Sequence, residues 1–153
     1  MKQIKFFAMA LVCLMMVAVN AMADDRPVPV QSLPAAAKQF VAANFPGATI
    51  VYAAKDDGKY ETTLSTGAQV DFTRKGAWDK VDCHTVAVPA AIVPAAIAAY
   101  VKASFPNTVI TKIDKERYGY EIELSNDVEL KFNHAGVMMA IDNRQLSYQE
   151  LSS

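Results

Sequence analysis

The spacing of apolar residues predicts two helices, each followed by a series of strands. Apolar side chains recur at helical spacing in two segments, and each segment has a proline in its first turn and another just after its end. The apolar positions are Leu33, Ala37, Phe40, Val41 and Phe45 in the first segment, and Val93, Ile97, Tyr100, Val101 and Phe105 in the second. The prolines are Pro34 and Pro46, then Pro94 and Pro106.

After each helix the apolar period changes to two, which is typical of strands that bury one face. Turn residues such as Asp56-Asp57-Gly58 separate the strands and indicate hairpins. The predicted strands are 48–55, 60–65, 69–73 and 77–82 after the first helix, and 108–115, 118–125, 128–133 and 137–142 after the second.

The two halves of the chain resemble each other. Residues 60–65 read YETTLS and residues 120–125 read YEIELS, and an offset of about 60 positions also aligns the helices and turns without a gap. We therefore predict an α+β fold of two tandem repeats, about 30–82 and 90–142, each made of one helix and an antiparallel four-stranded meander. One helix can cover only one face of such a meander, so the opposite face should be open. Residues 24–153 would form a single domain with a short C-terminal tail.

Alternation along the predicted strands assigns their side chains to the two faces. The face under the helices would carry Tyr60, Thr62, Leu64, Val70, Phe72 and Val81, with Tyr120, Ile122, Leu124, Leu130, Phe132 and Ile141. The open face would carry Glu61, Thr63, Gln69, Asp71, Thr73, Trp78, Lys80 and Asp82, with Glu121, Glu123, Glu129, Lys131, Asn133, Met138, Ala140 and Asp142. Carboxylates clearly outnumber lysines on this open face, although the whole chain has a formal net charge of −1.

The open face predicts a surface that binds a partner. An amphipathic ring on an exposed sheet is a frequent hot spot, and an acidic surround favours a basic protein or peptide. The predicted partner-binding residues are Trp78 at the centre, with Glu61, Asp71, Glu121, Glu123, Glu129 and Met138. Two alternatives stay open, since polar sheet faces also occur without any binding role, and the tail 143–153 could cover Trp78.

The N-terminal segment predicts export from the cytoplasm. Lys2 and Lys5 precede an unbroken apolar run over 6–19, and Ala21-Met22-Ala23 has the form of a cleavage site. We interpret residues 1–23 as a cleaved signal peptide and expect a periplasmic mature chain, because the run is short for a membrane anchor. The mature chain would then contain a single cysteine, Cys83, which we expect to be packed rather than reactive.

Other chemistry receives less support from the sequence. The nearly neutral charge and the lack of a basic stripe argue against a nucleic-acid partner. Neither His84 nor His134 has an evident nucleophile beside it, so we expect no enzyme and no catalytic residue. Calcium or a small ligand is the alternative function. Hard cations prefer clustered oxygens, so the candidates for a metal site are Asp24-Asp25, Asp56-Asp57 with Gly58, and the carboxylates of the open face, with Asp56 and Asp57 named first.

The order of motifs resembles a known family. The motifs are Leu33-Pro34, Phe45-Pro46, Tyr60-Glu61, Leu64, Gly67, Phe72, Gly76-Ala77-Trp78 and Val81-Asp82, most of which recur in the second half. This pattern resembles the PepSY-like, β-lactamase-inhibitor-like periplasmic proteins of Bacteroidetes across the mature chain. The resemblance implies a secreted protein with a continuous antiparallel sheet that is concave on its open side, and a domain that binds or inhibits proteins. The second half departs from the first at Asp127 and Met138, so two binding halves would differ.

Overall fold

The computed structural model describes residues 25–143, so the predicted signal peptide and most of the tail lie outside the described residues. One nine-stranded antiparallel sheet contains the strands in chain order, from β1 to β9. The strands are β1 (Arg26–Pro27), β2 (Ile50–Asp56), β3 (Lys59–Leu64), β4 (Gln69–Phe72), β5 (Trp78–Asp82), β6 (Ile110–Glu116), β7 (Gly119–Leu124), β8 (Val128–Asn133) and β9 (Met138–Asn143). The helices are a 3-10 turn η1 (Val30–Ser32), α2 (Ala35–Asn44) and α3 (Ala95–Ser104).

The predicted fold class is therefore wrong in its architecture. The chain does not form two tandem units of a helix and a four-stranded meander, because β5 pairs directly with β6 and joins all strands into one sheet. The pairs at this junction are Lys80 with Asp114, Val81 with Ile113, and Asp82 with Lys112. The unpaired backbone groups of a β5 edge would favour such pairing, which a prediction made for each unit separately does not include. The result is mostly sheet, with two short helices.

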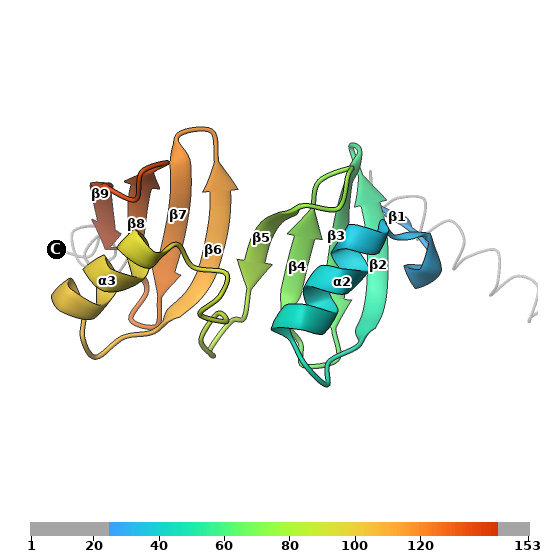
Figure 1. Ribbon diagram of the computed structural model, residues 1–153, viewed down its shortest axis with the longest axis horizontal. Coiled ribbons are helices and arrows are strands. Elements are labelled where there is room, and N and C mark those ends of the chain that lie inside the picture. Colours follow the sequence, from blue (N-terminus) through green and yellow to red (C-terminus); the bar gives the residue numbers. More distant parts are fainter. Residues whose placement is uncertain (1–24, 144–153) are drawn as a thin grey trace, which may run out of the picture.

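Both α2 and α3 lie on the same side of the sheet (Figure 1). Phe40 of α2 meets Phe72 of β4 edge to face, with ring centroids 5.7 Å apart, and Tyr100 of α3 meets Phe132 of β8 in the same way at 5.4 Å. Phe72 and Phe132 are fully buried. This apolar side of the sheet supplies most of the hydrophobic stabilisation. Among residues 25–143, no helix covers the other side of the sheet.

Two irregularities in the strands change which face a side chain occupies. The register between β4 and β5 shifts, so that Asp71 pairs with Lys80 whereas Phe72 pairs with Trp78. The same shift between β8 and β9 pairs Phe132 with Met138. An extra residue in one strand of a pair reverses the alternation beyond it. Trp78 and Met138 therefore face the helices, and their predicted place on the open face is wrong.

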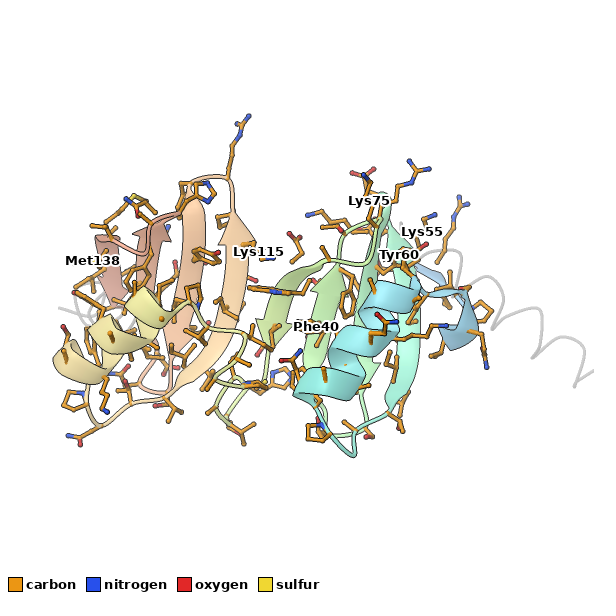
Figure 2. All side chains as sticks on the ribbon, viewed as in Figure 1. Phe40, Lys55, Tyr60, Lys75, Lys115 and Met138 are labelled. Carbon is orange, nitrogen blue, oxygen red and sulfur yellow. The ribbon has the colours of Figure 1, made fainter. Side chains whose placement is uncertain are left out.

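The packing of Trp78 confirms this placement. Its ring stacks on Phe40 at 6.4 Å, and the Lys115 ammonium lies 3.9 Å from the ring centroid. Figure 2 shows Phe40 on α2 and Lys115 projecting from β6 between the two halves of the sheet. Trp78 thus helps to connect α2 to the β5–β6 junction.

No described helix is long and apolar enough to span a membrane.

Candidate functional site

The side of the sheet opposite the helices carries two cross-strand rows of polar side chains. Strand pairing places one row in the order Glu61, Asp71, Lys80, Asp114, Glu121, Lys131, running from β3 to β8. The neighbouring row runs in the order Thr63, Gln69, Asp82, Lys112, Glu123, Glu129, Asp142, from β3 to β9. We call these residues the acidic face. Its carboxylates outnumber its three lysines, as predicted, and nearly all of its side chains are half-buried rather than fully solvated.

Asp71 is the most perturbed carboxyl group of the acidic face. Burial raises its pKa to about 6, the nearby Lys80 opposes this rise, and Glu61, Asp114 and Asp79 add to it. A hollow of about 150 Å³ lies beside it. The residues that line the hollow include Tyr52, Glu61, Thr63, Gln69, Asp71 and Lys80. A group whose charge is partly desolvated and surrounded by like charges would gain from an added cation.

Asp114 lies next to Lys80 on the other side of the β5–β6 junction. Its Oδ2 is 3.3 Å from the Nζ of Lys112, whereas its Oδ1 is buried and accepts no hydrogen bond. Burial raises the pKa of Asp114, and Lys112 and Lys80 oppose that rise. A buried oxygen without a donor costs free energy, on the order of 1–3 kcal/mol. Because this oxygen is buried, its lack of a donor is a cost that the fold itself carries.

The distal half of the acidic face is only partly neutralised by its own lysine. Lys131 lies 3.7 Å from Glu121 and 3.8 Å from Glu129, so a single ammonium serves two carboxylates. The hydroxyl of Tyr118 also donates a hydrogen bond of 3.1 Å to Glu121. Glu123 pairs across the strands with Lys112 on one side and with Glu129 on the other. Carboxylates therefore outnumber lysines among the described side chains of this half.

The structure brings together most, but not all, of the predicted binding residues. Those in the acidic face are Glu61, Asp71, Glu121, Glu123 and Glu129, whereas Trp78 and Met138 lie on the helix side. The acidic face also contains Lys112 and Asp114 of strand 108–115, which are not among the predicted binding residues. Their alternation with the buried Ile113 would have placed them on this face.

A second group of carboxylates lies near the start of the sheet. Asp25, Asp56 and Glu61 each place one carboxylate oxygen within 4.8 Å of the other two oxygens. Burial raises the pKa of Glu61, and the charges of Asp25 and Asp56 raise it further. This spacing can hold a hard cation, because calcium takes carboxylate oxygens at about 2.3–2.6 Å. Asp56 belongs to this group, whereas Asp57 lies in the adjacent turn with a φ of 43°.

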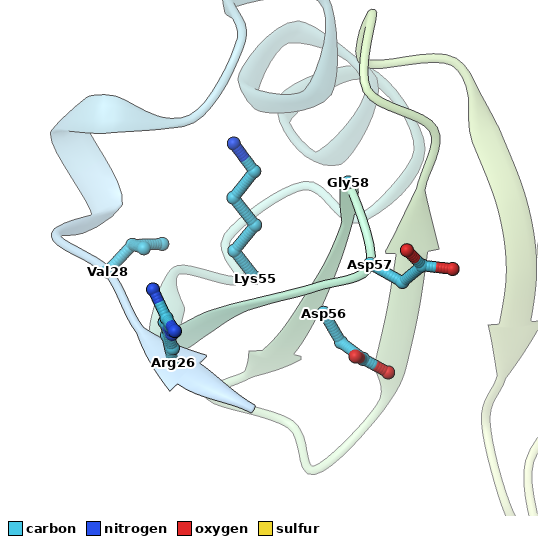
Figure 3. Close-up of a pocket in the computed structure, with 6 residues that line it drawn as sticks. All are labelled: Arg26, Val28, Lys55, Asp56, Asp57 and Gly58. Atoms are coloured by element: carbon cyan, nitrogen blue, oxygen red, sulfur yellow. The ribbon is translucent and has the colours of Figure 1, made fainter. Parts of the chain in front are cut away.

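A pocket near this group is open and of mixed charge. It has a volume of about 730 Å³, and its described lining residues are Arg26, Val28, Lys55, Asp56, Asp57 and Gly58. Figure 3 shows the charged ends of Arg26 and Lys55 directed away from the Asp56 and Asp57 carboxylates. Because cationic and anionic groups lie apart along its wall, the pocket itself does not define one kind of ligand.

The thiol and imidazole groups do not form a reactive pair. Cys83 is 6% exposed, and burial raises the pKa of its thiol, which disfavours the nucleophilic thiolate. His84 directs its Nε2 to the carbonyl oxygen of Gly67 at 3.0 Å, and His134 does the same to Arg117 at 3.0 Å. Both imidazoles thus contact backbone in turns, and among the described residues no hydrogen bond joins either of them to the Cys83 thiol.

A single antiparallel sheet with two helices on one side, and an acidic face on the other, defines a protein of the PepSY-like class. The chain matches the family described as "Putative beta-lactamase-inhibitor-like, PepSY-like" over residues 21–69 and 58–140, and it belongs to that family. No curated protein matches the chain.

Three solved structures support this assignment. A "putative calcium-regulated periplasmic protein" from Bacteroides thetaiotaomicron is 37% identical, with a TM-score of 0.73 over 78% of this chain and 97% of the other. A protein of unknown function from Bacteroides vulgatus is 31% identical, with a TM-score of 0.73 over 77% and 98% of the two chains. A DUF2874 protein from the same species is 34% identical, with a TM-score of 0.75 over 80% and 99%. All three are described as periplasmic, and the predicted periplasmic location of this chain is confirmed.

Proposed function

We propose that this protein is a non-catalytic periplasmic binding module whose acidic face holds a positively charged segment of another protein. The observation that carries the proposal is the double row of polar and mostly half-buried side chains, in which carboxylates outnumber lysines and Asp71 has a pKa raised to about 6. Solvated surface carboxylates would not show this desolvation. A face that had only to be soluble would gain nothing from keeping its charges partly out of water.

Binding of a cationic side chain would compensate a cost that the free protein already carries. Burial raises the pKa of Asp71 and of Asp114, and Lys131 lies near both Glu121 and Glu129. A lysine or arginine from a partner would supply donors and positive charge at both places. Since the carboxylates are already half-buried, the partner would add little further desolvation to them. Inhibition of a bound protein would be one consequence of such binding, in line with the family's description.

A pair of charge reversals tests the proposal. Glu123→Lys changes the centre of the distal half, whereas Glu116→Lys makes the same chemical change at the exposed end of β6. Both variants and the wild-type mature chain would serve as baits for cross-linking in the native envelope. We expect a protein that is captured by the wild type and by Glu116→Lys, is lost with Glu123→Lys, and binds less tightly as salt increases. Equal capture by all three baits would refute the proposal.

Calcium binding is the second candidate, and a specific arrangement favours it. Asp25, Asp56 and Glu61 bring their oxygens within 4.8 Å of one another, and the 37% identical relative is described as calcium-regulated. A calcium ion there would offset the repulsion that raises the pKa of Glu61. The group lies at one end of the acidic face, so calcium would also change the charge that a basic partner encounters.

The melting temperature distinguishes a specific calcium site from a group of carboxylates that attracts any cation. If the site is specific, millimolar calcium should raise the melting temperature, and chelator should reverse the effect. The rise should disappear in Asp56→Asn but persist in Asp57→Asn, which removes a charge from the neighbouring turn residue. An equal response of the two variants, or an equal response of the wild type to magnesium, would exclude a specific calcium site.

A further inference from the structure

Among the described residues the sheet ends at β9, and this strand exposes an apolar side chain at a position where the corresponding strand of the first half buries one. Val81 of β5 is fully buried, whereas Ile141, at the corresponding position in β9, is 52% exposed. Met139 in the same strand is 49% exposed. The difference has a simple cause, because β6 pairs with the outer edge of β5 and no described strand pairs with the outer edge of β9.

The opposite end of the sheet is arranged differently. There β1 pairs with β2 through Arg26 and Pro27, which face Lys55 and Ala54. Proline lacks an N–H donor, so a strand that contains it ends a sheet and discourages further pairing. The two ends are therefore not equivalent, and β9 is the edge in the described part of the chain that presents exposed apolar side chains next to the acidic face.

The β5–β6 junction shows which kind of strand fits such an edge. Opposite the buried Val81 lies Ile113, and opposite Asp82 lies Lys112. In β9 the corresponding residues are Ile141 and Asp142, and Asp142 pairs with Glu129 on its inner side. A matching strand would thus place an apolar residue against Ile141 and a basic residue against Asp142. A second copy of β9 would instead bring another carboxylate to this edge.

We propose that β9 accepts an extended segment of the partner protein as an additional strand, with an apolar side chain opposite Ile141 and a lysine or arginine opposite Asp142. Main-chain hydrogen bonds would provide affinity in this mode, and the alternating side chains would provide specificity. This inference rests on the proposed function, because the basic residues of the added strand would extend over the acidic face. It specifies the secondary structure and the sequence pattern of the bound segment.

The chain contains a suitable probe. A labelled peptide with the sequence of residues 108–117, TVITKIDKER, carries the Lys112 and Ile113 that pair with β5. Fluorescence anisotropy would measure its binding to the mature chain. We expect saturable binding that weakens at least about tenfold for Ile141→Arg, and also when the peptide carries Lys112→Glu. A loss of about 1.4 kcal/mol corresponds to that factor.

Val51→Arg is the matched control, because Val51 is 60% exposed and lies in β2, near the other end of the sheet. This variant should bind the peptide like the wild type. Absent peptide binding, or equal weakening by both arginine variants, would overturn the inference. So would a dimer in sedimentation that Ile141→Arg converts to a monomer, or binding that appears only after residues 144–153 are removed, since those results would identify a second copy or the chain's own tail as the occupant.

The same variants separate this inference from the proposed function. If Ile141→Arg has no effect on peptide binding while Glu123→Lys still abolishes capture of the basic partner, the edge is not the docking site but the acidic face remains one. If neither change affects binding, both proposals fail.

Discussion

Replacing Asp71 by asparagine should stabilise the protein at neutral pH and remove much of its dependence on pH. Asp71 is half-buried in the acidic face, and burial is the main cause of its raised pKa. Asparagine has nearly the same shape but carries no charge, so it avoids the desolvation of a carboxylate. It also loses the attraction of Lys80, but that attraction is the weaker effect, since the net shift of the pKa is upward.

The size of the effect follows from the pKa. A rise of the pKa from 3.8 to about 6 means that folding disfavours the charged form of Asp71, relative to the neutral form, by at most about 3 kcal/mol of free energy. We expect about 1–2 kcal/mol, because water screens a carboxylate that is only partly buried. The folded state binds the proton more tightly than the unfolded state. The free energy of unfolding of the wild type should therefore fall as pH rises from about 4 to about 6. Above about pH 6, the titration of Asp71 should contribute little further change.

Urea unfolding followed by the fluorescence of Trp78, the single tryptophan, would measure this. At pH 4.5 the wild type and Asp71→Asn should be similarly stable, and at pH 7.5 the variant should be more stable by the stated amount, or by about 5 °C in melting temperature. Asp57→Asn, in an exposed turn, should follow the wild type at both pH values. An Asp71→Asn variant that loses as much stability between pH 4.5 and 7.5 as the wild type would show that Asp71 is not desolvated.

Three further predictions concern the helix side of the sheet. Trp78→Ala should destabilise the protein by about 2 kcal/mol, since the ring stacks on Phe40, and an unchanged urea midpoint would contradict that packing. Gly76→Ala should destabilise it by at least about 1 kcal/mol more than Gly67→Ala in urea unfolding. Both glycines have positive φ, but only at Gly76 would a Cβ meet Pro34, at 2.8 Å. Cys83 should react with a thiol reagent only after unfolding, and rapid labelling of the native chain would show that the thiol is accessible.

The sequence predicted the elements well but not how they join. Both helices and eight of the nine strands lie close to their predicted positions, because strong periodicity and prolines mark their boundaries. The two-residue strand β1 is too short to produce a period. The pairing of β5 with β6 is a contact between distant segments that no local pattern encodes. The residue pattern predicted two separate units, whereas the family resemblance implied a continuous antiparallel sheet, and the structure confirms the continuous sheet.

The error on Trp78 has a specific physical reason. Strict alternation from Val81 back to Trp78 crosses an extra residue, and this bulge reverses the face of every earlier position in the strand. An alternation of apolar and polar residues with a period of two cannot show where a single extra residue is inserted. The face of the acidic residues was predicted correctly, because none of Glu61, Asp71, Glu121 or Glu123 lies beyond such an insertion.

The two sides of the sheet have opposite effects on stability, and this contrast links fold to function. The helix side buries Phe72, Phe132 and their neighbours, and it supplies the hydrophobic stabilisation. The acidic face contains carboxyl groups that oppose folding at neutral pH, because burial raises the pKa of Glu61, Asp71 and Asp114. Asparagine and glutamine would satisfy the same strand positions without that cost. Retention of charge where neutral side chains would stabilise the fold is expected of a surface that binds a cation. The stability gained by Asp71→Asn at neutral pH should therefore be accompanied by weaker capture of the basic partner.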